Sequence, residues 1–435
     1  MMNTERAVAS PSDIEEASAL LADAAASGLA VVPRGAGTGL SWGPPPSACD
    51  LVVDMRRMDQ VVEHAAGDLV AKVQAGASMG HVASVLAEAG QQLALDAPAG
   101  ATVGGVVATG TAGPRRFRYG APRDLLIGIT AVRADGIIAH SGGRVVKNVA
   151  GYDLGKLLAG SQGTLALITE ATFRLHPLPP AAAYLTAEFA PADRAAAVAA
   201  VTAAARSALV PSAVELDWPG SDPGTLRVGV LLEGTESGVA ARTEQMSLLL
   251  AADGGSPGVA VGDSPPPWWG RLPPSGPLPG GPGGLGGRAS PQDQGGSGGD
   301  RPPEGNAASS PQAGTVVRVS FWVARLAEAL DAVEACGAEA DLRPAVTGPA
   351  GVGLLYACLG PDAGGDAVAR FVTVLRGRLA GSPPRGSVVV LAGPVLAAGG
   401  LDALGQVPGT ALMRAVKDQF DPGNRMFPGR VFGGG

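Results

Sequence analysis

The chain has 435 residues, enough for two domains that each bury a core of their own. Its net charge of −7, with no Lys- or Arg-rich run, argues against nucleic acid as a partner. Cys49, Cys336 and Cys358 lie far apart and no C-x-x-C spacing occurs, so we expect no metal site and no iron–sulfur cluster held by this chain.

Residues 1–28 predict an acidic amphipathic helix capped by Ser12, which differs from the basic start and apolar core of a signal peptide. No uncharged apolar run reaches the length that spans a bilayer. We therefore expect a cytoplasmic protein, associated at most peripherally with the inner face of the cell membrane.

A short apolar strand, 29–32, leads into the loop Pro33-Arg34-Gly35-Ala36-Gly37-Thr38-Gly39-Leu40. Alternating glycines allow backbone N–H groups to converge on a phosphate, and Arg34 and Thr38 add a charge and a hydroxyl. The spacing fits neither the Rossmann fingerprint nor the Walker A loop. Taken alone, the loop is either a diphosphate-binding site or a glycine-rich turn without a ligand.

Two further segments are rich in small residues. Residues 96–116 include Pro98, the run Thr102-Val103-Gly104-Gly105 and the run Thr109-Gly110-Thr111-Ala112-Gly113. They indicate either a surface for a flat ring system or a tightly packed turn. Residues 142–175 predict a helix, a glycine turn at 160–163 and a buried strand.

From residue 181 the pattern restarts, with strands at 184–189, 214–217 and 225–232 and helices at 193–208 and 239–252. Residues 253–314 consist mainly of Gly, Pro and Ser and predict a disordered insertion, although Trp268-Trp269 should pack back on the domain. A strand at 316–321 and a helix at 324–336 continue the pattern. The fold class is therefore α+β, with a second α+β domain.

The pattern P-R-G-x-G-T-G-L, then T-V-G-G, then K-N-V-A-G-Y-D-L with G-S-Q-G-T-L and I-T-E, resembles the vanillyl-alcohol-oxidase/PCMH family of FAD-binding domains. K-N-V-A-G-Y-D-L, with A-G-P-R-R upstream, is similar to the FAD-binding (E) subunits of bacterial glycolate oxidases. The resemblance implies a two-subdomain PCMH-type FAD-binding domain (1–180), an α+β cap domain with an antiparallel sheet (181–410), and a tail (411–435) that returns to the FAD domain. Many relatives have Asn where this tail has Phe427, so no polar contact to the flavin is expected from that position.

The resemblance also implies non-covalent FAD as the cofactor. The implied cofactor-binding residues are Arg34, Gly35, Ala36, Gly37, Thr38, Gly39, Pro98, Thr102, Gly104, Gly105, Thr109, Gly110, Gly113, Gly163 and Ile168. Of these, residues 34–39 are assigned to the pyrophosphate, 102–105 to the pyrophosphate and ring, 109–113 to the isoalloxazine, and Gly163 and Ile168 to the adenosine half.

The catalytic groups are not evident from the sequence. None of His64, His81, His140 and His176 lies in the H-x-G-D-G-N segment that relatives oxidising 2-hydroxy acids share, and each is more simply structural. Arg115, Arg116 and Tyr119, with Arg118, are weak candidates for contact with a carboxylate substrate; a solvated or subunit-facing loop is the alternative.

The resemblance therefore implies an FAD-binding subunit of a heteromeric glycolate (2-hydroxy-acid) oxidase or dehydrogenase. A larger FAD-containing catalytic subunit would oxidise glycolate to glyoxylate, and an iron–sulfur subunit would pass electrons to the quinone pool. One alternative is a self-sufficient flavin oxidase that uses Tyr119, Tyr152 or the arginines. The other is a non-catalytic assembly subunit of the complex.

Overall fold

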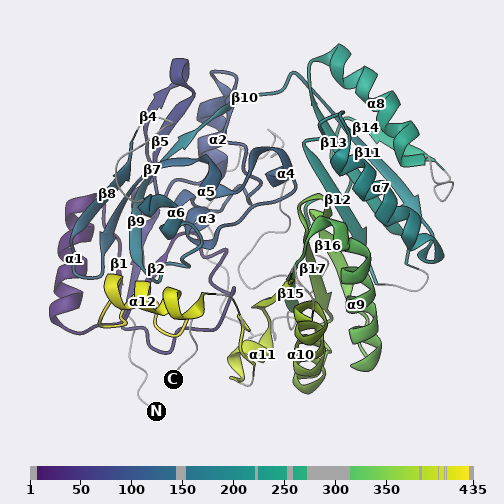
Figure 1. Cartoon of the computed structure of the whole chain (residues 1–435). Coiled ribbons are helices and arrows are strands. Elements are labelled where there is room, and N and C mark those ends of the chain that lie inside the picture. The colour runs from purple at the N-terminus through teal and green to yellow at the C-terminus, as the bar shows by residue number, and fades with distance from the viewer. Residues whose placement is uncertain are drawn as a thin grey trace, which may run out of the picture.

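The computed structural model describes residues 7–143, 153–220, 224–251, 258–271, 314–381, 385–399, 401–405, 407 and 409–430. Two layered halves face each other, one built from the N-terminal part of the chain and one from a large antiparallel sheet (Figure 1). The chain passes from the first half to the second directly after β10 (His176–Pro177). The α+β fold class is confirmed.

The first lobe of the N-terminal half is a small parallel sheet with the strand order β1-β3-β2. Its strands are β1 (Ala7–Ala9), β2 (Val31–Arg34) and β3 (Leu51–Asp54). Helix α1 (Ile14–Ala26) buries Ala17 and Leu21 in the core of this lobe. Its cap is Asp13, which accepts the Glu16 N–H, and not Ser12, whose own N–H and hydroxyl donate to the Glu16 carboxylate.

The second lobe is an antiparallel sheet with the order β4-β5-β9-β7-β8. Its strands are β4 (Val61–Ala65), β5 (Val70–Gln74), β7 (Leu126–Arg133), β8 (Ile138–Gly142) and β9 (Ala166–Arg174), and β6 (Gln91–Gln92) pairs with β10 beside it. Its helices are α2 (Met79–Ala87), α3 (Val103–Thr109), α4 (Arg116–Tyr119), α5 (Pro122–Leu125) and α6 (Leu154–Leu158). His140 lies within β8, where it faces Thr130.

The C-terminal segment returns to this half of the molecule. Helix α12 (Thr410–Phe420) lies below the N-terminal sheets in Figure 1, and Val416 and Phe420 pack on the core of the second lobe. After it, Val31 N–H donates to the Arg425 carbonyl at 2.8 Å, and Phe427 N–H donates to the Val31 carbonyl at 2.8 Å. The tail thus lies beside β2, the strand that precedes the glycine loop, and forms a parallel bridge with it at Val31 and Met426.

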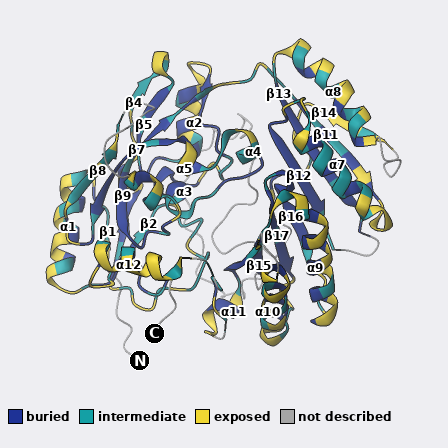
Figure 2. Cartoon of the chain, in the orientation of Figure 1, coloured by how far each residue is buried: buried dark blue, intermediate teal, exposed yellow. Residues whose placement is uncertain are grey.

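The second half is an eight-stranded antiparallel sheet, here called the cap sheet, with the order β14-β11-β13-β12-β16-β17-β15-β18. Its strands are β11 (Ala181–Phe189), β12 (Ala213–Trp218), β13 (Leu226–Gly234), β14 (Val259–Gly262), β15 (Thr315–Ser320), β16 (Ala345–Gly348), β17 (Leu354–Leu359) and β18 (Ser387–Ala392). Its helices are α7 (Arg194–Arg206), α8 (Glu236–Ala251), α9 (Leu326–Glu339), α10 (Gly365–Ala380) and α11 (Pro394–Ala397). Helices α7–α10 cover its outer face and expose their own outer sides (Figure 2), so the other face is turned toward the N-terminal half.

Part of the Gly/Pro-rich tract is ordered, against expectation. Val259–Gly262 forms β14, an edge strand whose backbone pairs antiparallel with β11. Trp269 is buried against Ala213 and Leu231, as predicted for the tryptophan pair. Residues 253–257 and 272–313 of the tract lie outside the described residues, as does the segment 144–152 with Lys147 and Tyr152. Among the described helices, none has both the length and the apolar character needed to cross a bilayer.

Candidate functional site

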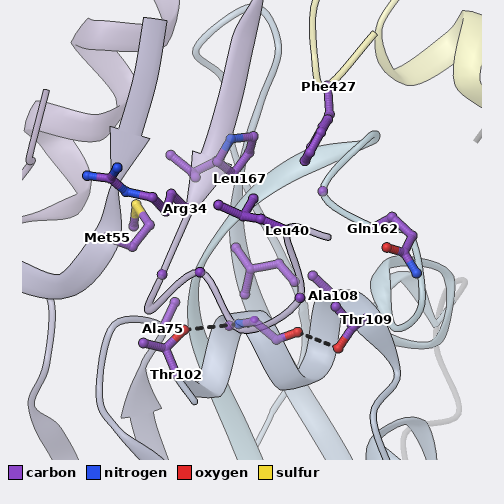
Figure 3. A pocket seen from close by; sticks show the side chains of 18 of the residues that line it. Arg34, Leu40, Met55, Ala75, Thr102, Ala108, Thr109, Gln162, Leu167 and Phe427 are labelled. Atoms are coloured by element: carbon purple, nitrogen blue, oxygen red, sulfur yellow. Dashed lines mark hydrogen bonds between the residues drawn. The ribbon is translucent and has the colours of Figure 1, made fainter. Parts of the chain in front are cut away.

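A cleft opens where the glycine loop, α3, β9 and the C-terminal tail meet, and it holds about 690 Å³ of space, part of it continuous with solvent (Figure 3). The predicted residues on its wall are Arg34, Gly35, Ala36, Gly37, Thr38, Gly39, Thr102, Gly104, Gly105, Thr109, Gly163 and Ile168. The wall residues that sequence reasoning missed include Met55, Ala75, Ala108, Gln162, Leu167, Phe427 and Arg430. Four segments far apart in the chain therefore form one concave surface.

The glycine loop is held against α3 at a distance that a side chain would prevent. A Cβ on Gly35 would lie 2.0 Å from Thr102 Oγ1, and Gly37 adopts a φ of +82°. Thr102 is itself fixed as the cap of α3. The glycines thus allow the loop to lie flat across the start of α3.

The loop presents unused backbone donors. In the part of the chain that the structure describes, the N–H groups of Ala36, Gly37, Thr38 and Gly39 have no protein acceptor. Consecutive free N–H groups at a glycine-rich turn are the usual backbone arrangement for binding an anion. This is the cradle that the diphosphate of a dinucleotide requires.

Arg430, from the tail, fixes the opposite side of the same loop. Its Nη2 donates to the Gly39 carbonyl at 2.7 Å and its Nη1 donates to the Leu40 carbonyl at 2.8 Å. The guanidinium lies 4.6 Å from the centre of the Phe427 ring, and burial lowers its pKa to about 10. Through these bonds Arg430 fastens the end of the glycine loop to the C-terminal tail.

Arg34 brings positive charge to the edge of the cleft. It shares the Asp54 carboxylate with Arg56, each guanidinium lying 2.7 Å from Oδ2. The Arg56 side chain, and then Arg34, hold the pKa of Asp54 well below its usual range. Two guanidinium groups on one carboxylate leave a net positive charge beside the loop.

Other predicted contacts differ in the structure. The Gly104 N–H donates to the Ala75 carbonyl at 2.8 Å, and the Gly105 N–H points to Thr102 Oγ1 at 3.4 Å, so these donors, expected for a phosphate or a ring edge, already have partners. Pro98, Gly110 and Gly113 are absent from the cleft wall. Gly113 packs on Asp96, and Gly110 ends α3 in the left-handed conformation.

One wall residue carries an unsatisfied polar atom. Gln162 has a φ of +59°, and its side-chain oxygen is buried without a donor in the described structure. Its backbone N–H donates to the Ala108 carbonyl at 2.7 Å, which holds the residue over α3. Such an acceptor suits the N–H groups of a heteroaromatic ring.

The catalytic candidates lie between the two halves of the molecule. Arg115 Nε binds Asp96 Oδ1 at 2.6 Å and its Nη1 lies 3.9 Å from Glu233 of the cap sheet. The Tyr119 hydroxyl donates to Glu233 Oε2 at 3.0 Å, and burial together with Glu233 raises the pKa of Tyr119 to about 12. These two residues therefore tie α4 to the cap sheet, and the Tyr119 hydroxyl stays protonated at neutral pH.

Two nearby side chains, those of His176 and Arg116, lack the carboxylate partner that Arg115 and Tyr119 have. His176 meets the Tyr119 ring edge-on at 4.8 Å, its Nδ1 is unsatisfied, and burial followed by Arg174, Arg118 and Arg115 lowers its pKa. The Arg116 guanidinium has no hydrogen bond or ion pair within the described residues. Sequence reasoning set His176 aside as structural. Its contact with Tyr119 joins two segments that are far apart in the chain and is not visible in the sequence.

The cap sheet contributes polar residues that sequence reasoning missed. Glu215, Arg318 and Tyr356 lie at positions where the neighbouring residues enter the helix-covered core. Burial raises the pKa of Glu215 well above its usual value, and one of its oxygens has no partner among the described residues. The sequence feature that could have identified these residues is the alternation of charged and apolar residues within a strand, as in V-V-R-V-S.

The described residues offer few groups for metal binding or for thiol chemistry. They contain no group of three or more His, Cys, Asp or Glu side chains placed to hold a metal ion. Cys336 and Cys358 are buried, and burial raises the pKa of the Cys358 thiol to about 12. Neither thiol is therefore poised to act as a ligand or a nucleophile.

Residues 6–142 match the protein family described as FAD binding domain. The chain is 40% identical over 171 residues to D-lactate dehydrogenase of Archaeoglobus fulgidus, which is 39% of this chain and 38% of the relative. It is 35% identical over 216 residues to glycolate oxidase subunit GlcD of Bacillus subtilis, 49% and 46% of the two chains. It is 37% identical over 139 residues to glycolate oxidase subunit GlcE of Escherichia coli, 31% and 40% of the two chains. The chain spans less than half the length of each of these relatives.

Solved structures show the same fold over nearly the whole chain. p-Cresol methylhydroxylase with substrate bound superposes with a TM-score of 0.72 at 15% identity, covering 99% of this chain and 90% of that one. Alkyldihydroxyacetonephosphate synthase gives a TM-score of 0.65 at 17% identity, covering 97% and 75%. The free N–H groups of the glycine loop, the positive charge beside it and the unsatisfied Gln162 oxygen fit a flavin dinucleotide. Residues 6–142 are therefore an FAD-binding domain with FAD as its cofactor, and the chain has the PCMH-type fold.

Proposed function

We propose that this chain is the FAD-binding subunit of a heteromeric glycolate (2-hydroxy-acid) oxidase or dehydrogenase. The observation that carries the proposal is the cleft that Arg430 and Arg34 border, lined by a glycine loop with four N–H groups that have no acceptor among the described residues. A bound flavin supplies a two-electron acceptor for the C–H bond of a 2-hydroxy acid. The residues proposed to bind it are those of the sequence prediction that line the cleft.

The relatives support this substrate class. Their names include D-lactate dehydrogenase and two glycolate oxidase subunits, GlcD and GlcE, and both of the latter are named as subunits. We infer that a larger FAD-containing subunit and an iron–sulfur subunit complete the enzyme, and that electrons pass through the latter to the quinone pool. Such an acceptor favours a site in the cytoplasm or at the inner face of the membrane.

The buried thiols support a separate electron carrier. Cys336 lies inside the core of the cap sheet and Cys358 on its other face, so neither is free to join a cluster without unfolding its strand or helix. The chain would then hold a flavin and depend on a partner for one-electron transfer.

A second candidate is a self-sufficient oxidase. His176 favours it, because the lowered pKa leaves the imidazole neutral and able to accept a proton, and its Nδ1 has no partner within the described residues. Tyr119 does not favour it, since its hydroxyl is held protonated by burial and by Glu233.

The visible spectrum of the purified chain separates these functions. We expect bound FAD, and no bleaching of the flavin band when glycolate or D-lactate is added under anaerobic conditions without partner subunits. Rapid bleaching by the chain alone would instead establish the self-sufficient oxidase. A colourless protein that takes up no added FAD would overturn both and leave an assembly subunit.

A further inference from the structure

The glycine loop continues directly into a contact with the cap sheet. Gly39 and Leu40 line the FAD cleft, and Trp42, two residues after Leu40, packs against an apolar cluster of the cap sheet. The next residue, Gly43, donates its N–H to the Leu391 carbonyl of β18 at 2.5 Å. The segment that lines the cleft is therefore attached to the other half of the molecule.

The cluster beneath Trp42 lies on the face of the cap sheet that its helices do not cover. The buried members of the cluster are Val316 of β15, Cys358 of β17, and Val389, Leu391 and Ala392 of β18. Val317 and Val390, neighbours of cluster residues along their strands, enter the helix-covered core, so the cluster points the other way. In Figure 1, β15 lies at the side of the cap sheet nearest to the N-terminal half. Trp42 therefore covers this cluster from across the interface between the halves.

Arg430 fixes both ends of the segment that carries Trp42. Its Nη1 donates to the Leu40 carbonyl at 2.8 Å and to the Pro44 carbonyl at 3.2 Å. Between these points Gly43 adopts a φ of +84°, which a residue with a side chain rarely adopts. Residues 41–43, here called the Trp42 segment, are thus held at their ends by the tail and at their centre by the cap sheet.

The contact that Tyr119 and Arg115 make with Glu233 is separate from the cleft. Glu233 belongs to β13, and four strands lie between β13 and β18 in the cap sheet. Neither Tyr119 nor Arg115 lines the cleft. The Trp42 segment, in contrast, begins at the cleft wall, so the conformation of the glycine loop and the position of Trp42 on the cap sheet depend on each other.

The glycine loop needs such an anchor because it contributes little to its own order. Glycine loses more conformational freedom on ordering than any other residue, and the loop contains Gly35, Gly37 and Gly39. Within the part of the chain that the structure describes, the N–H groups of residues 36–39 have no acceptor and do not hold the loop in place. Contacts at the end of the loop, such as those of Arg430 and Trp42, therefore decide its order.

We propose that Trp42 is a positioning residue for FAD, which holds the glycine loop in its binding conformation by packing on the cap sheet. The affinity for FAD then depends on the contact between Trp42 and the cap sheet. Because coupling between two sites is reciprocal, bound FAD in turn holds the β18 side of the cap sheet against the N-terminal half. The inference goes beyond the proposed function, since it involves neither a 2-hydroxy acid nor a partner subunit.

The affinity for FAD tests the first part of this proposal. In flavin fluorescence titration of the FAD-free full-length chain, we expect Trp42→Ala to weaken binding about tenfold, which is within the usual range for coupled sites. Trp42→Phe keeps an apolar ring and should weaken binding less. Trp322→Ala is the matched control, because Trp322 belongs to the same half as the cap sheet but is 62% exposed. Its affinity for FAD should equal that of the wild type.

Thiol labelling tests the second part and requires no substitution. Cys358 lies in the cluster that Trp42 covers, Cys336 lies in the helix-covered core, and both are buried. We expect removal of FAD from the wild type to accelerate modification of Cys358 by N-ethylmaleimide about tenfold and to leave Cys336 unchanged. Mass spectrometry of the peptides reads each thiol separately. In Trp42→Ala, FAD should no longer slow the modification of Cys358.

Three results would overturn the proposal. The first is a folded Trp42→Ala variant, checked by circular dichroism, that binds FAD as tightly as the wild type. The second is a rate of Cys358 modification in the wild type that is the same with and without FAD. The third is equal acceleration of Cys336 and Cys358, which would show that the cap sheet unfolds as a whole when FAD is removed. A flavin that no 2-hydroxy acid reduces would reject the proposed function and leave this inference intact.

Discussion

The Tyr119 hydroxyl donates to the Glu233 carboxylate across 3.0 Å, and this bond joins the FAD-binding domain to the cap sheet. Arg115 strengthens the joint from the same segment, with Nη1 3.9 Å from the other Glu233 oxygen and Nε on Asp96. Two residues that first suggested catalysis thus contribute to the contact between the two halves.

Tyr119→Phe should reduce the free energy of unfolding by about 1 kcal/mol, because the buried Glu233 loses its hydroxyl donor. Urea denaturation of Tyr119→Phe, Glu233→Gln and the double variant measures the coupling between the two residues. Strictly additive losses would show that the hydrogen bond does not contribute.

Gly35→Ala should lower the affinity for FAD at least about tenfold, since the new Cβ would lie 2.0 Å from Thr102 Oγ1 and displace the loop. Gly67→Ala is the matched control, because a Cβ there meets nothing within 4 Å. Adding Thr102→Ala should restore part of the affinity, which flavin fluorescence titration of the apoprotein detects. An unchanged affinity in Gly35→Ala would argue against the loop as the diphosphate cradle.

Arg430→Gln should weaken FAD binding by about tenfold to a hundredfold, because the loop carbonyls of Gly39 and Leu40 lose a charged donor. Arg425→Gln provides the comparison, since Arg425 lies in the same tail but donates to the Ala134 carbonyl. The ratio of flavin to protein absorbance after gel filtration reports the difference. Equal retention of FAD by both variants would contradict the positioning role.

Glu215→Gln should stabilise the protein more at pH 8 than at pH 5. Burial raises the pKa of Glu215 in the folded state, so the folded protein binds this proton more tightly than the unfolded chain. The stability that comes from this bound proton is complete below a pH of about 4.3, the pKa of a glutamate in the unfolded chain. It is lost as the pH rises above that value. Glutamine keeps the shape of the neutral acid at every pH, so the variant should lose less stability with rising pH.

Guanidinium denaturation at the two pH values tests this difference. Glu244→Gln, at an exposed position of α8, is the control that should leave the pH dependence of stability unchanged. Parallel curves for the wild type and Glu215→Gln would show that Glu215 is ionised in the folded protein.

Part of the local structure could be predicted from the residue pattern. The period of the apolar residues predicted several strands and helices of both halves, such as the strand at 184–189 and the helix at 193–208, and the spacing of Gly35, Gly37 and Gly39 predicts a phosphate loop. Both depend on interactions between residues close in the chain, where side-chain period and backbone freedom decide the structure. The ordered strand β14 was missed because its pairing with β11 depends on a strand about 70 residues earlier.

Which polar groups already have partners depends on how distant segments pack in the folded chain. The N–H groups of Gly104 and Gly105 resemble free donors in the sequence, yet the fold gives them acceptors and leaves those of residues 36–39 open. Likewise, Arg115 and Arg116 are adjacent in the chain, but the fold brings Asp96 and Glu233 to Arg115 and leaves the Arg116 guanidinium without a partner among the described residues. Pairing of charges depends on distances between segments that are separate in the sequence, and those distances exist only once the chain has folded.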